Sequence, residues 1–400
     1  MVHAAERTTR IEPSASSVAT QRARELKQQG HDIIALTQGQ PDFDTPDHVI
    51  EAAIAAMKGG ETRYTPVGGT PAMVDAIRLK FKRDNALDYA ANEVMASNGG
   101  KQVVYNALMA TVEPGDEVII LAPCWVSYVD MARFADGVPV VVQCLEENGF
   151  KLTPEQLEAA ITPKTRWLIL NSPNNPAGSV YSESELKALG DVLARHERVL
   201  VMSDDIYEHI IFDGRQYATL AAAAPHMRER TLTMNGVSKA YSMTGWRIGI
   251  CGGPADLIKT MSKLQNQSTG NPSSVSQAAA VAAFAGPHEI VRERTAEFQK
   301  RRDRIVAMLN DCAGLTCTTP EGAFYAFPNC AGLIGRKTPD GKVMQNDRDI
   351  VMFLLEHAGV AAVHGAAYCT SPHFRLSFAA SMAEIEEACR RIQASCQALA

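Results

Sequence analysis

The 400-residue sequence has no long uninterrupted apolar stretch, no excess of basic charge and no apolar core in its first ten residues. An apolar run of about eighteen residues would predict a membrane-spanning helix. The net charge of −6 argues against a sequence-independent nucleic-acid binder, which needs a basic surface. The polar first ten residues do not have the pattern of a secretory signal peptide. We therefore expect a soluble, cytoplasmic protein.

The sequence also has no Cys-x-x-Cys pair and no other metal-ligand spacing among its nine cysteines. An odd number of cysteines in a long chain fits a reducing compartment better than a framework of disulfides. Several of these cysteines lie in apolar runs, as thiols packed in a protein core do. The cysteines therefore predict free thiols and no bound metal.

Short apolar runs alternate with helical patterns through much of the chain, which predicts an α/β fold with a mostly parallel sheet. The length favours one large and one smaller domain. We expect an N-terminal arm with part of the small domain at 1–45, a large domain at 46–286 and a small α+β domain at 287–400. The predicted strands of the large domain lie at 94–97, 117–121, 138–142, 167–170, 199–203, 231–235 and 247–251.

Helical patterns fill several of the gaps between these strands, and a long charged helix at 287–310 leaves the large domain. In the small domain, 322–327 and 374–378 have the pattern of strands. The chain closes with a helix at 381–399, where Ser381 and Glu384 have the spacing of a capping box. The other predicted helices lie at 101–112, 182–196 and 274–284.

Lys239 is the most informative residue, because it directly follows the apolar stretch 231–237. This is an unusual place for a solvated charge, but it suits an amine that condenses with a carbonyl. Burial or a neighbouring cation lowers the pKa of a lysine and keeps its amine nucleophilic. Ser238 and Arg247 supply a hydroxyl and a guanidinium suited to a phosphate. An amine beside a phosphate site indicates pyridoxal phosphate, although most single lysines are simply surface charges.

Ligands of open α/β sheets gather at the carboxyl ends of the strands, so the residues that follow each strand are candidates for the site. Gly99 and Gly100 precede a predicted helix, where exposed backbone N–H groups favour an anion. A plain tight turn would have the same pattern. Trp125 follows the strand at 117–121 and could lie flat on an aromatic cofactor, or it packs in the core.

Two further strand ends carry polar groups suited to a pyridine ring. The loop 171–178 has three asparagines and two X-Pro bonds, which favour a rigid loop that aims an amide at a ring hydroxyl. Asp204 and Asp205 follow the strand at 199–203. An aspartate on the pyridine nitrogen would keep the ring cationic and able to accept electrons, but either residue could instead cap a helix. Tyr207, from the same turn, could reach the ring oxygen.

Arg375 stands alone in the apolar strand predicted at 374–378. A buried arginine needs an anionic partner. The partner is either an acid of the protein or the carboxylate of a substrate held by the guanidinium fork. The sequence leaves both alternatives open.

Taken together, these residues resemble the class I aminotransferases of the pyridoxal-phosphate fold-type I family, and within it the bacterial aspartate aminotransferase branch. The resemblance covers nearly the whole chain, from Leu36 to Ser377. The motifs that carry it are Leu36-Thr-Gln-Gly39-Gln-Pro-Asp-Phe-Asp-Thr-Pro46, Arg63-Tyr64-Thr-Pro, Asn98-Gly-Gly-Lys, Asn171-Ser-Pro-Asn-Asn-Pro, Ser203-Asp-Asp-Ile-Tyr, Ser238-Lys-Ala and Gly245-Trp-Arg.

The resemblance implies that the large domain binds pyridoxal 5'-phosphate through a sheet packed between helices. It implies that Lys239 forms a Schiff base with the cofactor and that Asp204, rather than Asp205, contacts the pyridine nitrogen. The remaining implied contacts are those of Tyr207 and Asn175 with the ring oxygen, of Trp125 stacked on the ring, and of Ser238, Arg247 and the Gly100–Lys101 backbone with the phosphate.

For the substrate, the resemblance implies that Arg375 and the Gly39 backbone bind the α-carboxylate, beside Trp125 and Asn175. It also implies a homodimer with shared active sites, because Tyr64 would reach the phosphate of the partner subunit's cofactor.

Three departures from the family pattern bear on the substrate. Cys124 stands where many relatives have tyrosine, and Cys369 lies in the substrate-side loop. The segment 265–280 contains no arginine, whereas the animal and enteric dicarboxylate enzymes carry one in the matching region. Lys101 is a candidate replacement by charge alone, although an exposed lysine in the first turn of a helix is common.

The resemblance thus predicts a transaminase that moves an amino group between an L-amino acid, with aspartate as first choice, and 2-oxoglutarate. The kinetics should be ping-pong, with Lys239 as the general base at the α-carbon. An aromatic amino acid or prephenate aminotransferase is an alternative, and so is a β-lyase or ring-forming enzyme on the same scaffold, since one carbanion serves both fates. A regulatory module fused to a DNA-binding domain is disfavoured, because about 35 residues precede the first motif.

Overall fold

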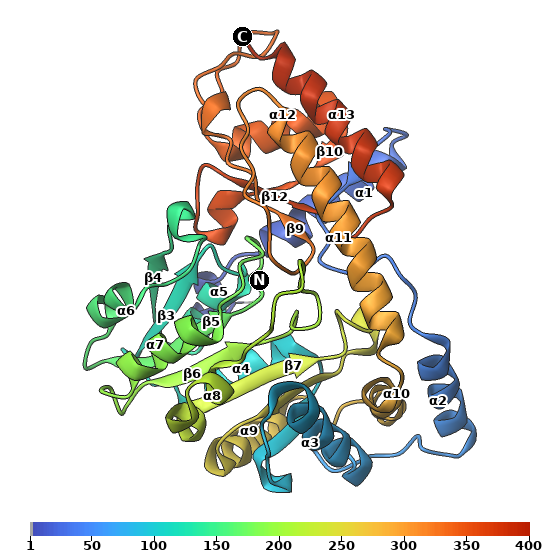
Figure 1. The fold of residues 1–400 in the computed structure, drawn as a ribbon, viewed down its shortest axis with the longest axis vertical. Helices are drawn as coiled ribbons and strands as arrows, with labels where there is room; N and C mark the ends of the chain where they lie inside the picture. The colour runs from blue at the N-terminus through green and yellow to red at the C-terminus, as the bar shows by residue number, and fades with distance from the viewer. Residues whose placement is uncertain (1–2) are drawn as a thin grey trace.

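The computed structural model describes residues 3–400 and contains three β-sheets. The largest has seven strands in the order β2-β8-β7-β6-β5-β3-β4 (Figure 1). Adjacent strands of this sheet run parallel, except that β8 runs antiparallel to both of its neighbours, β7 and β2. The predicted fold class is therefore confirmed. The strands are β2 (Val94–Ser97), β3 (Glu117–Ala122), β4 (Val138–Gln143), β5 (Thr165–Asn171), β6 (Leu200–Asp204), β7 (Thr231–Gly236) and β8 (Gly249–Gly252).

Helices cover both faces of this sheet, because its central strands are apolar on both sides. Along β3, Ile120 packs with residues of α4, α5 and α9 on one face, whereas Ile119 packs with α7 on the other. This alternation follows from the pleat of a strand. The helices around the sheet are α2 (Asp47–Lys58), α3 (Pro71–Asn85), α4 (Gly100–Thr111), α5 (Ser127–Phe134), α6 (Pro154–Ala160), α7 (Glu183–Leu193), α8 (Leu220–Ala223), α9 (Ala255–Ser268) and α10 (Ser274–Ala285).

The remaining strands form two small sheets that stand to one side of the large one (Figure 1). One is antiparallel in the order β11-β12-β9, and the other pairs β1 with β10 in parallel. The long helix α11 connects the two parts of the molecule. The elements of the smaller part are α1 (Ala15–Gln28), β1 (Ile34–Ala35), α11 (Glu289–Asn310), β9 (Tyr325–Ala326), α12 (Asp347–Ala358), β10 (Val360–Ala361), β11 (Val363–His364), β12 (Phe374–Ser377) and α13 (Met382–Ala398).

The predicted strands of the large sheet are all present, and their ends differ from the prediction by at most two residues. The strand predicted at 247–251 begins only at Gly249, because Arg247 adopts a left-handed conformation with φ 55° after a short 3-10 turn. The strand predicted at 322–327 is reduced to β9. The capping box of Ser381 and Glu384 at the start of α13 is confirmed. The domain boundaries at 45/46 and 286/287 stay predictions.

All nine cysteines are free thiols, and eight of them are buried. Within residues 3–400, no helix combines the length and the apolar character that crossing a membrane requires.

A buried ion pair joins α3 to the turn that follows β6. Lys80 and Glu208 contact each other with side chains that are 1% and 2% exposed. Lys80 also donates to Asn85 Oδ1 at 2.6 Å, and Asn85 donates to Glu208 Oε2 at 2.7 Å. Burial alone would raise the pKa of Glu208, but Lys80 and His209 hold this pKa well below its usual range. The carboxylate therefore stays charged in the core only because the cation accompanies it.

Replacing Lys80 by alanine leaves the Glu208 carboxylate buried without its cation. We expect Lys80→Ala to lower the free energy of unfolding by about 3–5 kcal/mol. The matched control is Lys82→Ala, because Lys82 pairs with Asp88 on the surface, where both side chains are more than 60% exposed. That change should cost less than about 1 kcal/mol. Denaturant unfolding of the two variants measures the difference, and equal losses would contradict the role of the buried pair.

Candidate active site

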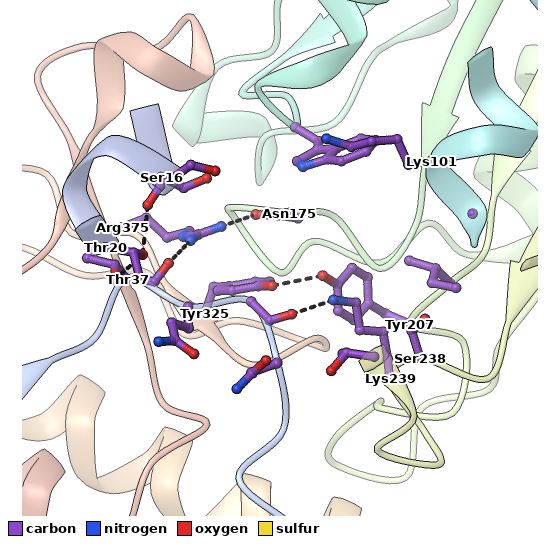
Figure 2. Close-up of a pocket in the computed structure, with 18 of the residues that line it drawn as sticks. Ser16, Thr20, Thr37, Lys101, Asn175, Tyr207, Ser238, Lys239, Tyr325 and Arg375 are labelled. Atoms are coloured by element: carbon purple, nitrogen blue, oxygen red, sulfur yellow. Dashed lines mark hydrogen bonds between the residues drawn. The ribbon is translucent and has the colours of Figure 1, made fainter. Parts of the chain in front are cut away.

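The carboxyl ends of the parallel strands open on a cavity of about 690 Å³ between the large and small parts (Figure 2). Segments far apart in the sequence line it, from α1 to β12. All but one of the site residues predicted from the sequence reach this cavity, namely Gly39, Gly100, Lys101, Trp125, Asn175, Asp204, Tyr207, Ser238, Lys239, Arg247 and Arg375. The exception is Tyr64, which is 99% exposed and lies outside the cavity.

Lys239 lies in the loop after β7 and points its amine into the cavity (Figure 2). Its Nζ donates to the backbone oxygen of Gly39 and lies 5.5 Å from the ring centre of Tyr207. Burial, with Arg375 as a second cause, lowers the pKa of Lys239 to about 8. A substantial fraction of this amine is therefore neutral near pH 8, as an attack on a carbonyl requires.

The structure separates the two aspartates that the sequence left equivalent. Asp204 ends β6 and lines the cavity, where it accepts a hydrogen bond from the Tyr128 hydroxyl. Asp205 accepts from the Ser203 hydroxyl at 2.7 Å and does not line the cavity. Burial raises the pKa of Asp204 to about 6, a rise that Tyr128 limits. Asp204 is thus the carboxylate that can meet a basic ring nitrogen in this cavity.

An anion site lies where α4 begins. The Arg247 guanidinium passes close to Gly99, where a Cβ would lie 2.2 Å from its Nη2, and the φ of 92° at Gly99 favours glycine. Arg247 donates to the Thr244 backbone oxygen at 2.9 Å and has no acidic partner within residues 3–400. Ser238 also lines this end of the cavity. An unpaired guanidinium, a hydroxyl and a helix N-terminus together suit a phosphate.

Aromatic residues form the walls between these groups. Trp125 packs edge-on against Tyr128, with ring centres 5.3 Å apart. On another side, the hydroxyls of Tyr207 and Tyr325 share a hydrogen bond of 2.8 Å (Figure 2). Asn175 is fixed by its backbone N–H, which donates to Asn171 Oδ1 at 2.9 Å. The cavity therefore offers flat walls and hydroxyl groups to an aromatic ligand.

Arg375 is 3% exposed, and its guanidinium faces the cavity without an acidic partner among residues 3–400. It donates to Asn175 Oδ1 at 3.0 Å and to the Thr37 backbone oxygen at 2.6 Å, and it lies 4.4 Å from the ring centre of Tyr325. Its Nε has no hydrogen-bond partner. The alternative of an internal acid therefore finds no support in the described residues, and the guanidinium is available to an anion that enters the cavity.

The sequence reasoning missed several residues that line or support the cavity, chiefly on α1. The Thr20 hydroxyl bonds the Ser16 backbone oxygen and the Thr37 hydroxyl, both at 2.8 Å, and so ties α1 to the segment that holds Arg375. Only one residue of α1 is buried, so the helix has no apolar stripe that would reveal it. Tyr128 stands three residues after Trp125, in the first turn of α5, a helix that the sequence reasoning did not predict.

These residues fit pyridoxal phosphate. A buried carboxylate, an amine of lowered pKa and a guanidinium without an acidic partner in residues 3–400 line the same cavity, the guanidinium beside the start of α4. A Cβ at Gly99 would meet the Arg247 guanidinium, so the glycine leaves this guanidinium its place at the start of α4. Asp204, Arg247 and Lys239 could hold the ring nitrogen, the phosphate and the aldehyde of this cofactor.

Comparisons with known proteins agree with this chemistry. Residues 31–392 match the family model described as aminotransferase class I and II. The aspartate/prephenate aminotransferase of Cereibacter sphaeroides is 51% identical over 399 residues, with 100% of both chains covered. The crystal structure of the aspartate aminotransferase from Rhizobium meliloti matches with a TM-score of 0.98 at 50% identity, again over 100% of both chains. The aspartate aminotransferase from Thermus thermophilus with maleate has a TM-score of 0.91 at 39% identity, covering 99% of this chain and 100% of that one.

The lowered pKa of Lys239 predicts how its reactivity depends on pH. Only the neutral amine attacks an aldehyde, so the rate of condensation with pyridoxal phosphate in the cofactor-free protein should rise with pH to a midpoint near 8. An ordinary lysine would have its midpoint near about 10.4. In Arg375→Met the midpoint should move to higher pH, because a positive neighbour that opposes protonation is gone. Stopped-flow absorbance measures both profiles, and a wild-type midpoint near 10 would refute the role of burial.

Proposed function

Because the chain belongs to the class I and II aminotransferase family, we propose that it transfers the amino group of an L-amino acid, with aspartate first, to 2-oxoglutarate. Pyridoxal phosphate is the cofactor of this family, and transamination is its chemistry. The observation that carries the proposed substrate class is the presence of two cations, Arg375 and Lys101, on opposite sides of the cavity (Figure 2). Neither has an acidic partner in residues 3–400. Two separated cations suit a dicarboxylic amino acid.

Arg375 would bind the α-carboxylate of the substrate. Asn175 and the Thr37 backbone oxygen orient the guanidinium from one side, and the free Nε remains for the ligand. Gly39 stands two residues after Thr37 and also lines the cavity. Its backbone oxygen accepts a hydrogen bond from the Lys239 amine. Trp125 and Asn175 would enclose the substrate from the cofactor side. This arrangement holds the α-carbon close to the Lys239 amine.

Lys101 would bind the side-chain carboxylate. Its Nζ lies 5.0 Å from the Trp125 ring centre and 3.2 Å from the Ser127 hydroxyl, so an aromatic face and a neutral group orient the cation. Burial, with Arg247 as a second cause, lowers the pKa of Lys101. A carboxylate beside Lys101 would relieve this cost by pairing with the charge. The maleate named with the Thermus enzyme is a dicarboxylate, which agrees with the proposal.

When bound, pyridoxal phosphate supplies the aldehyde that exchanges with the amino group and a ring that accepts the electrons of the Cα–H bond. Lys239 removes the proton from the substrate Cα, since part of its amine is neutral near pH 8. Asp204 holds a proton at the ring nitrogen, and Tyr207 donates to the ring oxygen. Ser238, Arg247 and the backbone at Gly100 and Lys101 keep the phosphate in place. The amino and oxo acids then react in turn, in a ping-pong sequence.

Prephenate is a second candidate as the amino acceptor. The name of the Cereibacter relative includes it, and prephenate also carries two carboxylates. The same pair of cations would therefore serve both substrates.

We also infer that the chain acts as a homodimer with shared active sites. The support is Tyr64, a large side chain that is 99% exposed in the single chain. A second subunit would cover it and place its hydroxyl near the partner subunit's phosphate.

A screen of the first half-reaction tests the proposed function. Each amino acid is mixed with the holoenzyme without an oxo acid, and conversion of the cofactor from its aldehyde to its amine form is followed by absorbance. Aspartate and glutamate should react fastest, and prephenate or 2-oxoglutarate should restore the aldehyde form. Release of pyruvate and ammonia from a β-substituted amino acid would instead indicate the lyase. Lys239→Ala should keep its fold but lose turnover, and near-normal transamination by this variant would refute the assignment.

The role of Lys101 predicts a change in specificity rather than a general loss. A hydrogen bond to a charged group contributes about 1.5–3 kcal/mol, so Lys101→Ala should lower kcat/KM for aspartate by about 10- to 150-fold. The value for alanine, which has no side-chain carboxylate, should change little. Ser127→Ala is the matched control, since it removes only the neutral neighbour of Lys101. Equal losses for aspartate and alanine would contradict a side-chain contact.

A further inference from the structure

Cys124 and Cys369 meet beside the cavity, although they belong to the two different parts of the molecule. Cys124 follows β3, and Cys369 follows the short 3-10 turn Gly365–Tyr368 that comes after β11. The backbone N–H of Cys124 donates to the Tyr368 oxygen at 3.0 Å. Gln143 Nε2 donates to the Cys369 oxygen at 3.0 Å. The first bond joins the backbone of Cys124 to the residue before Cys369, and the second joins Cys369 to the end of β4.

Cys369 packs against the buried apolar cluster that contains Cys124, so the two thiols lie in the same part of the core. Cys124 is 2% exposed, whereas Cys369 is only half-buried and therefore within reach of a small reagent. Interaction with the Cys124 thiol, assisted by Arg133, lowers the pKa of Cys369 to about 7, while the pKa of Cys124 lies well above its usual range. One member of the pair is thus a half-buried thiol that ionises more readily than an ordinary cysteine, and the other is a buried thiol near it.

The backbone at Cys369 carries a further sign of function. Its φ of 60° is left-handed, a conformation that favours glycine and costs other residues about 1–2 kcal/mol. A cysteine is kept here against that strain, near a second cysteine that stands 245 positions earlier in the sequence.

We propose that Cys124 and Cys369 form a reversible disulfide that ties two walls of the cavity together and slows turnover. The oxidant is hydrogen peroxide. The Cys369 thiolate attacks one peroxide oxygen, so that an S–O bond forms, the O–O bond breaks and the departing oxygen leaves as water after protonation. The Cys124 sulfur then attacks the sulfenic sulfur, the S–S bond forms and the S–O bond breaks with release of a second water. Two thiols are oxidised, one peroxide is reduced, and a dithiol reverses the change.

The link would act on the site through the neighbours of the two cysteines. Trp125, directly after Cys124, lines the cavity. Tyr368, directly before Cys369, lies with its ring centre 5.1 Å from the Arg375 guanidinium. A disulfide would therefore fix the tryptophan wall relative to the arginine wall, so any movement of these walls during substrate entry or product release would be restrained. This inference goes beyond the proposed transamination, because the pair carries no role in it.

The experiment treats the holoenzyme with a small excess of hydrogen peroxide. The intact mass should fall by about 2 Da, the mass of two hydrogens, and digestion should give one cross-linked peptide that contains both cysteines. Turnover should fall at least several-fold and recover with a dithiol. Cys369→Ser, which keeps the size of the side chain, should start near wild-type activity and resist the oxidant. Cys124→Ser should also form no cross-link, which covers the case that one variant folds poorly.

The matched control is another pair of cysteines, Cys312 and Cys396, which lie in the same buried cluster. Both are buried in the core of the small part, with exposures of 3% and 1%. Cys312→Ser should still form the cross-link between Cys124 and Cys369 and lose turnover as the wild type does. The proposal is overturned if peroxide leaves Cys124 and Cys369 as free thiols, or if the cross-linked enzyme turns over at the normal rate.

Discussion

A surplus of positive charge facing one cavity is the constraint on which the site depends. Its three main cations are oriented by backbone oxygens, which hold a cation in place without cancelling its charge: Arg375 by Thr37, Arg247 by Thr244, and Lys239 by Gly39. An acid in any of these positions would have neutralised the group. The charge is thus kept for the phosphate and for substrate carboxylates, and the same surplus helps to keep the Lys239 amine partly neutral.

Much of the site could be predicted because of how the sheet is built. Its strands are apolar on both faces, so charged residues just past their carboxyl ends, such as Asp204 and Lys239, are conspicuous in the sequence. Trp125 follows a strand end in the same way. The order of the strands did not have to be known for this, since all of these ends meet at one edge. Local signals also sufficed for the capping box at Ser381.

What could not be predicted depends on direction and on distant packing. Asp204 and Asp205 are chemically identical, and only the local geometry at the end of β6 turns one toward the cavity. That no acid of residues 3–400 pairs with Arg375 could be seen only in the folded structure. The part that helix α1 takes in the site could not be predicted, because the helix buries only one residue and contacts the site through hydroxyl groups such as that of Thr20.

The pairing of β1 with β10 has a consequence for how the protein is made. More than 300 residues separate Ile34 from its partner Val360, so during synthesis the first strand waits for almost the whole chain to emerge. At ribosomal rates of about 5–20 residues per second, that delay is roughly 15 seconds to a minute. The large sheet, whose strands end at Gly252, has all its segments available much earlier. The nascent chain can therefore complete the cofactor side of the cavity while Arg375 and its supports are still untranslated.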